Sequence, residues 1–396
     1  MTSSTSNTAG DARLMPAGPL ARVGIIGGGQ LGRMMTKKAK QLGCEVHVLD
    51  PYPQSPAGMV ATYQTVGRFD DAEKIREVVE ACDVTTYDIE HIDAEILATL
   101  EAEGHVIFPR PALLAIIQDK LLQKEHLIAH DIPTSPFVAV DEPTMADAEA
   151  FGFPLVQKAR KGGYDGKGVS VIRSKDDIDN ILHCPSIFEK MVDIEMELAV
   201  MVARNAHGEI ATYPVTEMEF DARANLLDLL LVPARISDSL ADQARAMAAD
   251  VVTAFDGVGI FGVEMFLNKA GELLINEVAP RPHNSGHYTL DACATCQFEQ
   301  HIRAILGLPL GATKLWAPAT MINLIGEPGS IGAAQIEGMR DALATPGATV
   351  HIYGKNECRP FRKMGHITVV DDSMDAALEK AAKLRDLVTF HGADKL

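Results

Sequence analysis

The chain has 396 residues, 47% of them apolar, and its 54 acidic residues outnumber its 36 lysines and arginines for a net charge of −18. A chain of this length exceeds what a single hydrophobic core usually organises, so we expect two or three packed domains. The negative charge argues against a nucleic-acid partner, and the lack of an apolar run of about 18 residues argues against a membrane-spanning helix.

The first residues and the cysteines indicate the cellular context. Residues 1–20 lack the charged-then-apolar pattern of a secretory signal, and we expect a disordered tail there. Six cysteines scattered through a chain of this length are typical of a reducing cytoplasm. Cys293 and Cys296 form a C-x-x-C, which is compatible with a redox pair or half of a zinc site. Because no second pair of ligands stands nearby in the sequence, we expect plain buried thiols.

Residues 21–112 are predicted to form an α/β layer. A short apolar strand ends in a run of glycines, and a helical stretch and a second strand follow. Gly27, Gly29 and Gly32 satisfy G-x-G-x-x-G at the start of this helix, and Asp50 stands about where an acidic residue would hold a ribose. The pattern alone allows an NAD-dependent dehydrogenase, a site for another phosphate on backbone N–H groups, or a tight turn without a ligand.

Residues 113–312 are predicted to form an α+β domain, and residues 313–396 a C-terminal domain. The first of these begins with one helix at about 112–131 and contains a smaller unit at 132–190. Further strands and helices are predicted from periodicity, and they are a strand at 155–158, a strand at 198–203, a helix at 239–255, a hairpin at 259–276, a helix at 295–306, strands at 321–324, 349–353 and 366–370, and a helix at 374–387.

A second glycine-rich segment, Gly162–Gly168, follows the strand that ends at Lys158. No helical pattern comes directly after it, so it is neither a P-loop nor a dinucleotide-binding turn. We expect a flap whose backbone N–H groups cover nucleotide phosphates, with Lys158 supplying a point charge to the same oxygens. A plain surface hairpin is the alternative.

The predicted hairpin carries two carboxylates. Its apolar strands are joined by the turn 268–271, and cross-strand neighbours share a face, so Glu264 and Glu277 are expected to lie nearly opposite each other. Two such carboxylates repel unless a cation lies between them, and Mg²⁺ prefers hard oxygen ligands. The sequence therefore predicts a magnesium site, with two solvated surface glutamates as the alternative.

Donor-rich segments follow the hairpin. The stretch Arg281–His287 is irregular and contains prolines, which indicates a loop beside the carboxylate pair that recognises a substrate. No serine or cysteine has a convincing catalytic partner, so covalent acyl chemistry is not expected. A basic cluster in this acidic chain is either a phosphate clamp or a solvated face, and it consists of Lys355, Arg359, Arg362, Lys363 and His366.

Taken together, these segments resemble the N5-carboxyaminoimidazole ribonucleotide synthetases of the ATP-grasp superfamily, from about Val23 to the end of the chain. The segments that carry the resemblance are Gly28–Met34, Gln118–Lys124, Gly162–Gly168, Asn276–His287 and Arg362–His366. The chain is also similar to the matching domain of fused fungal carboxylases, without their separate mutase domain. The resemblance implies an α/β and α+β architecture: an ATP-grasp fold with an N-terminal Rossmann-like (pre-ATP-grasp) domain and a small C-terminal β-rich domain.

The resemblance also implies residue roles. ATP would be contacted by Lys120, Lys158, Gly163, Tyr164, Gly166, Lys167, Gly168, Glu189, Lys190, Val192, Glu197 and Asn276. Mg²⁺ would be held by Glu264 and Glu277. The aminoimidazole ribonucleotide would be surrounded by Gly29, Gln30, Leu31, Asp88, Glu90, Asn284, Ser285, His287, Lys355, Arg359 and Arg362. Residues acting on the reacting groups would be Asp165, Arg281, His283 and Lys363, with Asp165 or His283 handling the amine proton.

The implied activity is ATP-dependent carboxylation of 5-aminoimidazole ribonucleotide by bicarbonate, through carboxyphosphate, in a cytoplasmic homodimer without nucleic-acid or membrane partners. Three rivals stand beside it. A dehydrogenase explains only the first glycine motif, a non-catalytic regulatory paralogue would have lost ligands that are present here, and a formate-using ribonucleotide transformylase differs only in the acid used.

Three positions depart from the family pattern. Lys120 stands where bacterial members often have arginine, which keeps the charge and loses the planar fork. Asp88 stands where glutamate is usual. Phe220 occupies a position where many members have a histidine near the nucleotide, so no role is assigned to it.

Overall fold

The computed structural model describes residues 20–163, 168–221 and 226–395. Its N-terminal part is a parallel sheet of order β3-β2-β1-β4, built from β1 (Arg22–Ile26), β2 (Glu45–Asp50), β3 (Tyr63–Val66) and β4 (Val84–Tyr87). The helices of this part are α1 (Gln30–Gln41), α2 (Ala72–Glu80) and α3 (Ala94–Ala102). Strands β1 and β4 are buried at nearly every position, as expected for parallel strands covered on both faces.

Two short helices connect this sheet to the rest of the chain. The single helix predicted at 112–131 is wrong, because the structure has α4 (Pro111–Ile117) and α5 (Lys120–Ala129). Between them the side chain of Asp119 accepts a hydrogen bond from the Leu121 N–H at 3.0 Å and caps α5. A capped helix start satisfies its own first N–H groups and so begins a new helix.

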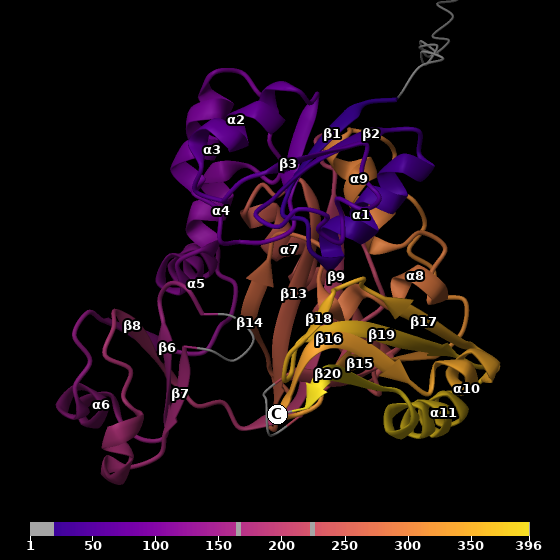
Figure 1. Ribbon diagram of the computed structural model, residues 1–396. Coiled ribbons are helices and arrows are strands. Elements are labelled where there is room, and N and C mark those ends of the chain that lie inside the picture. The colour runs from indigo at the N-terminus through magenta and orange to yellow at the C-terminus, as the bar shows by residue number, and fades with distance from the viewer. Residues whose placement is uncertain (1–19, 164–167, 222–225, 396) are drawn as a thin grey trace, which may run out of the picture.

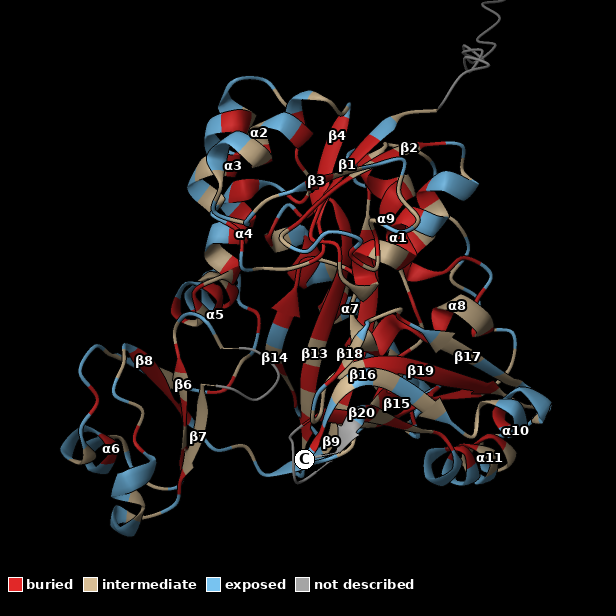
Figure 2. Ribbon diagram, viewed as in Figure 1, coloured by how far each residue is buried: buried red, intermediate tan, exposed pale blue. Residues whose placement is uncertain are grey.

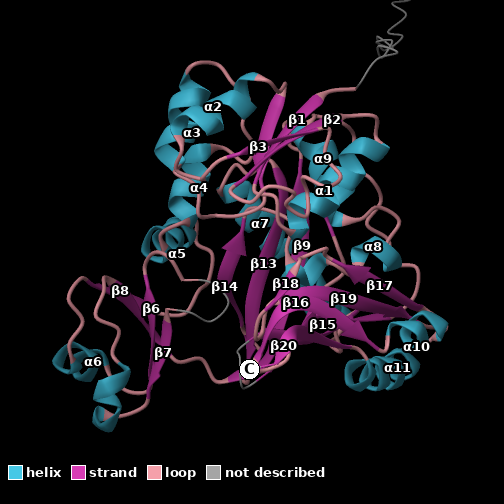
Figure 3. Ribbon diagram, in the orientation of Figure 1, coloured by secondary structure: helices cyan, strands magenta, loops and turns pink. Residues whose placement is uncertain are grey.

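A small lobe projects from the side of the molecule (Figure 1). It consists of β5 (Phe137–Val140), α6 (Met145–Phe151), β6 (Leu155–Ala159), β7 (Val169–Ile172), the 3₁₀ turn η1 (Lys175–Asn180) and β8 (Ser186–Lys190). Its antiparallel sheet has the order β5-β8-β6-β7, and the glycine-rich segment joins β6 to β7. Figure 3 shows α6 on the outer side of this sheet.

The largest sheet in the described part of the chain has nine strands. Its main path is β14-β13-β9-β11-β12-β15-β19-β17, with β10 paired to β9. The strands are β9 (Ile194–Arg204), β10 (Ile210–Thr212), β11 (Thr216–Asp221), β12 (Leu226–Val232), β13 (Gly259–Asn268), β14 (Leu273–Ala279), β15 (Ala319–Ile325), β17 (Ala348–Ile352) and β19 (Lys363–Val370). Buried residues concentrate on central strands such as β13 (Figure 2).

Helices cover this central sheet. The long helix α7 (Asp238–Ala254) buries Ala244, Ala248 and Val251, which recur at helical spacing on one face, against β9 and β13. The remaining elements are η2 (Asn284–Gly286), α8 (Thr289–Ala292), α9 (Gln297–Ile305), β16 (Ser330–Glu337), α10 (Met339–Ala344), β18 (Glu357–Cys358), α11 (Met374–Leu387) and β20 (Thr389–Lys395). No helix in the described ranges is long and apolar enough to cross a bilayer.

The C-terminal strands extend the central sheet. Strand β12 pairs with β15 in antiparallel register, with Leu229 opposite Ile322, so the predicted boundary at residue 313 divides strands of one continuous sheet. Strands β18, β16 and β20 form a separate small sheet. The division into domains stays a prediction.

Helix α9 joins the N-terminal sheet to the central sheet. Its His301 is fully buried, accepts a hydrogen bond from the Ile260 N–H on β13 through Nδ1 at 3.1 Å, and contacts Thr86 Oγ1 on β4 through Nε2 at 2.7 Å. Burial lowers the pKa of His301 to about 3, so the ring is neutral, with its proton on Nε2. One side chain thereby fixes two sheets relative to each other.

Candidate active site

The two hairpin carboxylates face each other, as predicted. In the register of β13 and β14, Glu264 pairs with Glu277, whereas nearer the turn Met265 pairs with Ile275. The register therefore shifts by one residue, and Asn276 is the extra residue of a β-bulge. A regular ladder would have placed Glu264 opposite Asn276, so the bulge is what brings the two glutamates together.

Cationic and amide groups surround the pair. The Lys120 ammonium lies 2.9 Å from Glu277 Oε1, and His283 Nε2 lies 3.6 Å from Glu264 Oε1. The Asn276 amide donates to Glu264 Oε2 at 3.4 Å. Burial acts to raise the pKa of Glu277, but Lys120 outweighs it and the pKa is lowered.

The donor set fits Mg²⁺. Burial, followed by repulsion from Glu277 and Glu197, raises the pKa of Glu264 to about 8. Burial likewise raises the pKa of Glu197 to about 7. A divalent cation with hard oxygen ligands would remove this repulsion and hold the carboxylates ionised. The side chain of Glu264 is 17% exposed and that of Glu277 48%, but Lys120 and His283 contact them, so they are not two independently solvated glutamates as in the alternative reading.

Lys158 is held on the same side as the carboxylates. Its ammonium donates to Asn276 Oδ1 at 2.9 Å and pairs with Glu189 Oε2 at 3.0 Å. Glu189 is itself buried and pairs through its other oxygen with Lys124 at 3.1 Å. The predicted ATP contact of Glu189 therefore does not use a free carboxylate, since both oxygens face lysines.

Carboxylates occupy the glycine turn at the start of α1. Asp88 Oδ2 accepts hydrogen bonds from the N–H groups of Gly29 and Gly32, each at 3.0 Å, and Asp50 accepts from the Gly28 N–H at 2.9 Å. Gly27 has φ of +108°, and an added Cβ there would lie 1.5 Å from Asp88 Oδ1. Burial raises the pKa of Asp88 to about 7.

Two consequences follow for the predicted roles of this turn. In a dehydrogenase, Asp50 would have to be available to a ribose, yet its carboxylate is committed to the N–H groups of Gly28 and Tyr52. The first N–H groups of a helix have no intrahelical partner, so the N–H groups of Gln30 and Leu31 are the donors that this turn offers to a ligand.

The loop after the hairpin is tied down by ion pairs and amides. Both oxygens of Glu90 contact Arg281, at 2.9 Å from Nε and 3.0 Å from Nη2. Gln297 accepts from the His283 N–H at 2.8 Å and donates to the His283 carbonyl at 2.8 Å and to His287 Nδ1 at 3.0 Å. Burial lowers the pKa of His287 well below its usual value, so His287 is neutral.

Asn284 and Ser285 lie in the same loop. Ser285 is fully buried and its hydroxyl lies 2.9 Å from His283 Nδ1. Both polar side-chain atoms of Asn284 are buried and have no hydrogen-bond partner among the described residues. A buried amide without partners is costly in a native protein, so Asn284 is suited to receive a polar ligand.

The basic cluster lies where the last strands meet the first sheet. Lys363 is close enough to lower the pKa of Glu264, and Lys355 donates to the Lys363 carbonyl at 2.7 Å. Arg359 pairs with Glu357 at 2.6 Å, and Arg362 donates to the Glu357 carbonyl at 2.8 Å. The structure thus brings Lys363 to the carboxylate pair and holds the two arginines together at one turn.

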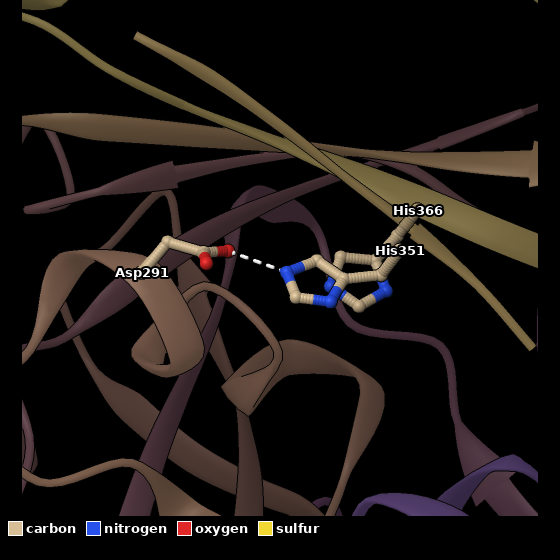
Figure 4. Close-up of side chains that lie close together, drawn as sticks. All are labelled: Asp291, His351 and His366. Atoms are coloured by element: carbon tan, nitrogen blue, oxygen red, sulfur yellow. Dashed lines mark hydrogen bonds and ion pairs between the residues drawn. The ribbon is translucent and has the colours of Figure 1, made fainter. Parts of the chain in front are cut away.

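Stacked histidine rings on β17 and β19 pack against His287 in the loop after the hairpin. His351 Nε2 lies 2.8 Å from Asp291 Oδ2, and the rings of His351 and His366 are stacked at 4.5 Å with 16° between their planes (Figure 4). His366 continues the stack to His287 at 4.8 Å. Asp291, His351 and His366 offer ligand atoms within 4.8 Å of one another. Because lone pairs lie in the ring planes, stacked rings direct them side by side and away from one shared ion.

The remaining predicted site residues lie in or beside the glycine-rich loop and near the end of β8. Tyr164, Asp165, Gly166 and Lys167 lie outside the described residues. Their neighbours Gly163 and Gly168 flank that gap at the base of the β6–β7 loop. On the other side of the small lobe, Lys190 ends β8 and is exposed, and Val192 follows it in the connection to β9.

Sequence reasoning missed Lys124. It lies in the segment that carried the family resemblance, but it was assigned no role. Leu121, Lys124 and Leu127 recur at three-residue spacing and are all buried on one face of α5. A lysine on an otherwise apolar stripe was the available signal, because a buried ammonium requires a partner.

Phe220 packs against buried apolar residues, and the two cysteines of the C-x-x-C are themselves buried. Phe220 lies on β11 and packs against a buried cluster that includes Met218 and Leu227. Cys293 and Cys296 are free, buried thiols, in agreement with the prediction. Burial raises the pKa of Cys293 to about 12, so its thiol is protonated.

Three family descriptions match consecutive parts of the chain. The ribonucleotide synthetase preATP-grasp domain matches residues 20–118, the ATP-grasp domain residues 125–298, and the phosphoribosylaminoimidazole carboxylase C-terminal domain residues 319–380. These matches confirm the predicted ATP-grasp fold with an N-terminal preATP-grasp part and a C-terminal part.

Relatives match over nearly the whole chain. The N5-carboxyaminoimidazole ribonucleotide synthase of Synechococcus elongatus is 42% identical over 89% of this chain and 90% of its own length. The crystal structure of the corresponding synthetase from Thermotoga maritima is 52% identical, with a TM-score of 0.88, and covers 94% of this chain and 99% of that one.

Two fungal matches complete the comparison. The Aspergillus clavatus enzyme, solved in complex with ADP and 5-aminoimidazole ribonucleotide, is 36% identical with a TM-score of 0.85, covering 92% of this chain and 98% of that one. Candida albicans phosphoribosylaminoimidazole carboxylase is 43% identical over 90% of this chain. The chain spans only 65% of that carboxylase's length.

Proposed function

The chain belongs to the N5-carboxyaminoimidazole ribonucleotide synthetase family of ATP-grasp ligases, and from this premise we propose that it carboxylates 5-aminoimidazole ribonucleotide. Bicarbonate and ATP are the other substrates, and ADP, phosphate and N5-carboxyaminoimidazole ribonucleotide are the products, in purine biosynthesis. The observation that carries the proposal is the bulged hairpin, which sets Glu264 opposite Glu277 with Lys120 at 2.9 Å.

The lysines serve the phosphate transfer. Bicarbonate attacks the γ-phosphate of ATP to give carboxyphosphate, and negative charge accumulates on the transferring group. Lys120 and Lys158 are ammonium groups held by Glu277, Glu189 and Asn276 at the carboxylate pair, so their positions are set before ATP arrives. Positioning and charge neutralisation are the main tasks of these residues.

The metal site is assigned to the carboxylates. Glu264 and Glu277 would hold Mg²⁺, with Asn276 beside them on the bulge. Bound there, Mg²⁺ would neutralise charge on the ATP phosphates. Without a bound cation, Glu264 is partly protonated because its pKa is raised.

The loop after the hairpin serves the second half of the reaction. Carboxyphosphate, or the CO₂ released from it, is captured by the exocyclic amine of the ribonucleotide, in a site that must exclude water. Arg281 and His283 approach the carboxylate pair from this loop and Lys363 from β19. Proton transfer from the amine is assigned to His283 or to Asp165.

The ribonucleotide is assigned to the space between the first sheet and the basic cluster. The N–H groups of Gln30 and Leu31 and the side chains of Lys355, Arg359 and Arg362 would contact its phosphate. Arg359 lies near Tyr52, in the loop after β2. Asn284 would satisfy its buried amide on the same ligand.

The proposal is tested by ADP release from MgATP, with and without bicarbonate and aminoimidazole ribonucleotide. We expect release that requires both, and its loss in Glu277→Gln. Glu272→Gln is the matched control, since Glu272 carries the same charge on the exposed turn of the same hairpin. Release supported by formate in place of bicarbonate would assign the chain to transformylase chemistry instead.

We also infer a cytoplasmic homodimer without nucleic-acid or membrane partners, divided into domains 21–112, 113–312 and 313–396. The six free cysteines support a reducing compartment, and the family resemblance supports the dimer. Size-exclusion chromatography with light scattering tests the assembly, and a single monomer peak at micromolar concentration would contradict it. Limited proteolysis tests the domain boundaries.

A further inference from the structure

Lys124 lies outside the small lobe but reaches into it. It is on α5, 3% exposed, and donates to Thr134 Oγ1 at 2.7 Å and to Ser135 Oγ at 2.9 Å. Thr134 in turn donates to the Ile275 carbonyl on β14 at 2.8 Å. Lys124 is therefore anchored at the segment through which the chain passes from α5 into the small lobe.

From this anchor a chain of contacts runs to the metal ligands. Lys124 pairs with Glu189 Oε1 at 3.1 Å, and Glu189 Oε2 pairs with Lys158 at 3.0 Å. Lys158 also donates to Asn276, whose amide donates to Glu264. Glu189 is thus a buried carboxylate shared by two ammonium groups, of which only Lys158 is directed to the carboxylate pair.

A second ion pair joins α5 to the small lobe without touching this chain. Arg160 contacts both oxygens of Asp119, at 3.0 Å and 2.7 Å. The Arg160 carbonyl accepts from the Lys120 N–H at 2.9 Å. In the pair Lys124–Glu189 the cation lies on α5, whereas in the pair Asp119–Arg160 the cation lies in the small lobe. These two ion pairs both hold the lobe to α5, and each can be removed by its own substitution.

We propose that Lys124 is a positioning residue, which acts through Glu189 to set where the Lys158 ammonium lies over the carboxylate pair. The inference rests on the proposed function for the identity of the phosphate donor. With Lys124 present, Glu189 is neutralised from both sides and Lys158 remains shared with Asn276. Without it, the buried carboxylate keeps a single cation and draws Lys158 away from the phosphates.

The charge of Lys124 is conditional on pH. Burial lowers its pKa to about 8, against the raising effect of Glu189, and Lys158 and Lys120 also lower it. The ammonium is therefore present below about pH 8 and is lost above it. If Lys124 acts through its charge, kcat/KM for ATP should fall above about pH 8, which gives the rate profile an alkaline limb. If Lys124 acts only through packing, no alkaline limb is expected.

The main test compares Lys124→Met with wild type by kcat, by KM for ATP and by calorimetric binding of MgADP. We expect kcat/KM for ATP to fall about tenfold or more, because a buried charge is left with one partner instead of two. KM for the ribonucleotide stays unchanged. Lys383→Met is the matched control, since it removes the same charge from an exposed ion pair on α11.

Three further variants separate positioning from folding. Glu189→Gln in the Lys124→Met background removes the unbalanced carboxylate and restores part of the loss. Lys124→Arg keeps its charge above pH 8 and therefore lacks the alkaline limb. Arg160→Gln loosens the lobe at the other contact, raises KM for ATP and retains the limb.

The outcomes are decisive in each direction. Wild-type kcat/KM and an unchanged alkaline limb in Lys124→Met would overturn the proposal. So would a loss explained entirely by a lower melting temperature, with no recovery from Glu189→Gln. If Lys124→Met does not fold, the pH profile of Lys124→Arg decides alone. MgADP affinity requires no turnover, so it tests Lys124 even if bicarbonate-dependent ADP release fails.

Discussion

Two pairs of acids among the described residues have different surroundings: Asp50 and Asp88 are buried, whereas the side chain of Glu264 is 17% exposed and that of Glu277 48%. Asp50 and Asp88 at the start of α1 accept hydrogen bonds from backbone N–H groups of the glycine turn. Glu264 and Glu277 on the hairpin face each other, and repulsion from Glu277 adds to the burial that raises the pKa of Glu264. The first pair accepts mainly from the backbone, although Asp88 Oδ1 has no hydrogen-bond partner, whereas the second pair contacts the side chains of Lys120, Asn276 and His283.

The difference teaches how to distinguish a structural acid from a ligand. A carboxylate whose oxygens accept from peptide N–H groups stabilises a turn and has little left to offer. A carboxylate directed at another carboxylate is unfavourable in the folded protein and is retained for what it binds. The G-x-G-x-x-G pattern and the hairpin both suggested ligand sites from sequence, but the hairpin sets two carboxylates opposite each other, whereas those at the turn accept from backbone N–H groups.

The largest expected effect comes from Glu264→Gln, which keeps the size and removes the charge. We expect ADP release to fall by about a hundredfold or more, because Mg²⁺ loses one of two carboxylates. The free energy of unfolding should stay equal or rise without metal, since the repulsion with Glu277 and Glu197 disappears. Steady-state kinetics and urea denaturation measure both, and a strongly destabilised variant would contradict the comparison.

Gly27→Ala is expected to have the largest effect on the glycine turn. The new Cβ would overlap Asp88 Oδ1, and alanine is strained at a φ of +108°. We expect the free energy of unfolding to fall by about 2 kcal/mol or more. Gly43→Ala is the control, because it also has positive φ but meets no atom within 4 Å. Equal losses in the two variants would show that the Asp88 contact adds nothing.

Asp88→Asn should change how stability depends on pH. The folded-state pKa of Asp88 is raised to about 7, so its contribution to stability is full at low pH and is lost as pH rises through about 7. Asparagine does not ionise, so the variant should gain on wild type between about pH 4, near the unfolded-state pKa, and about pH 7. Denaturation midpoints with MgCl₂ present measure this, and parallel curves would contradict it.

Asp50→Asn is expected to have the smallest effect. The amide oxygen still accepts from the N–H of Gly28 or Tyr52, so we expect a loss below about 1 kcal/mol in unfolding free energy. ADP release should remain within about threefold of wild type. A loss as large as that of Glu264→Gln would mean that Asp50 contacts a ligand after all.

Much of the fold was predictable because periodicity is local. The strands predicted at 155–158 and 198–203 fall within β6 and β9, and the helix predicted at 374–387 matches α11. The helix predicted at 112–131 was wrong because its interruption depends on Asp119, a polar residue whose capping role is visible only in the structure. The continuity of the sheet across residue 313 depends on the pairing of β12 with β15, which no local pattern encodes.

The candidate site was predictable where two of its residues share a hairpin. The turn after β13 places Glu264 near Glu277, although the bulge that aligns them was not foreseen. The contact of Lys120 with Glu277 joins residues 157 positions apart, and that of Asp88 with Gly29 joins residues 59 apart. Such contacts follow from packing of the whole chain, and only the family resemblance suggested that these residues meet.

The pairing of β12 with β15 has a consequence for evolution and for engineering of this chain. If the polypeptide ended before β15, Leu229–Val232 would become a bare edge with unpaired N–H and C=O groups. Apolar residues such as Leu231, which pack beneath the last strands, would be uncovered beside it. We expect such a truncated chain to self-associate, because the unpaired N–H and C=O groups of β12 can pair with a strand of another copy. By covering this edge, the last strands prevent the central sheet from pairing edge to edge with the central sheet of another copy of the chain.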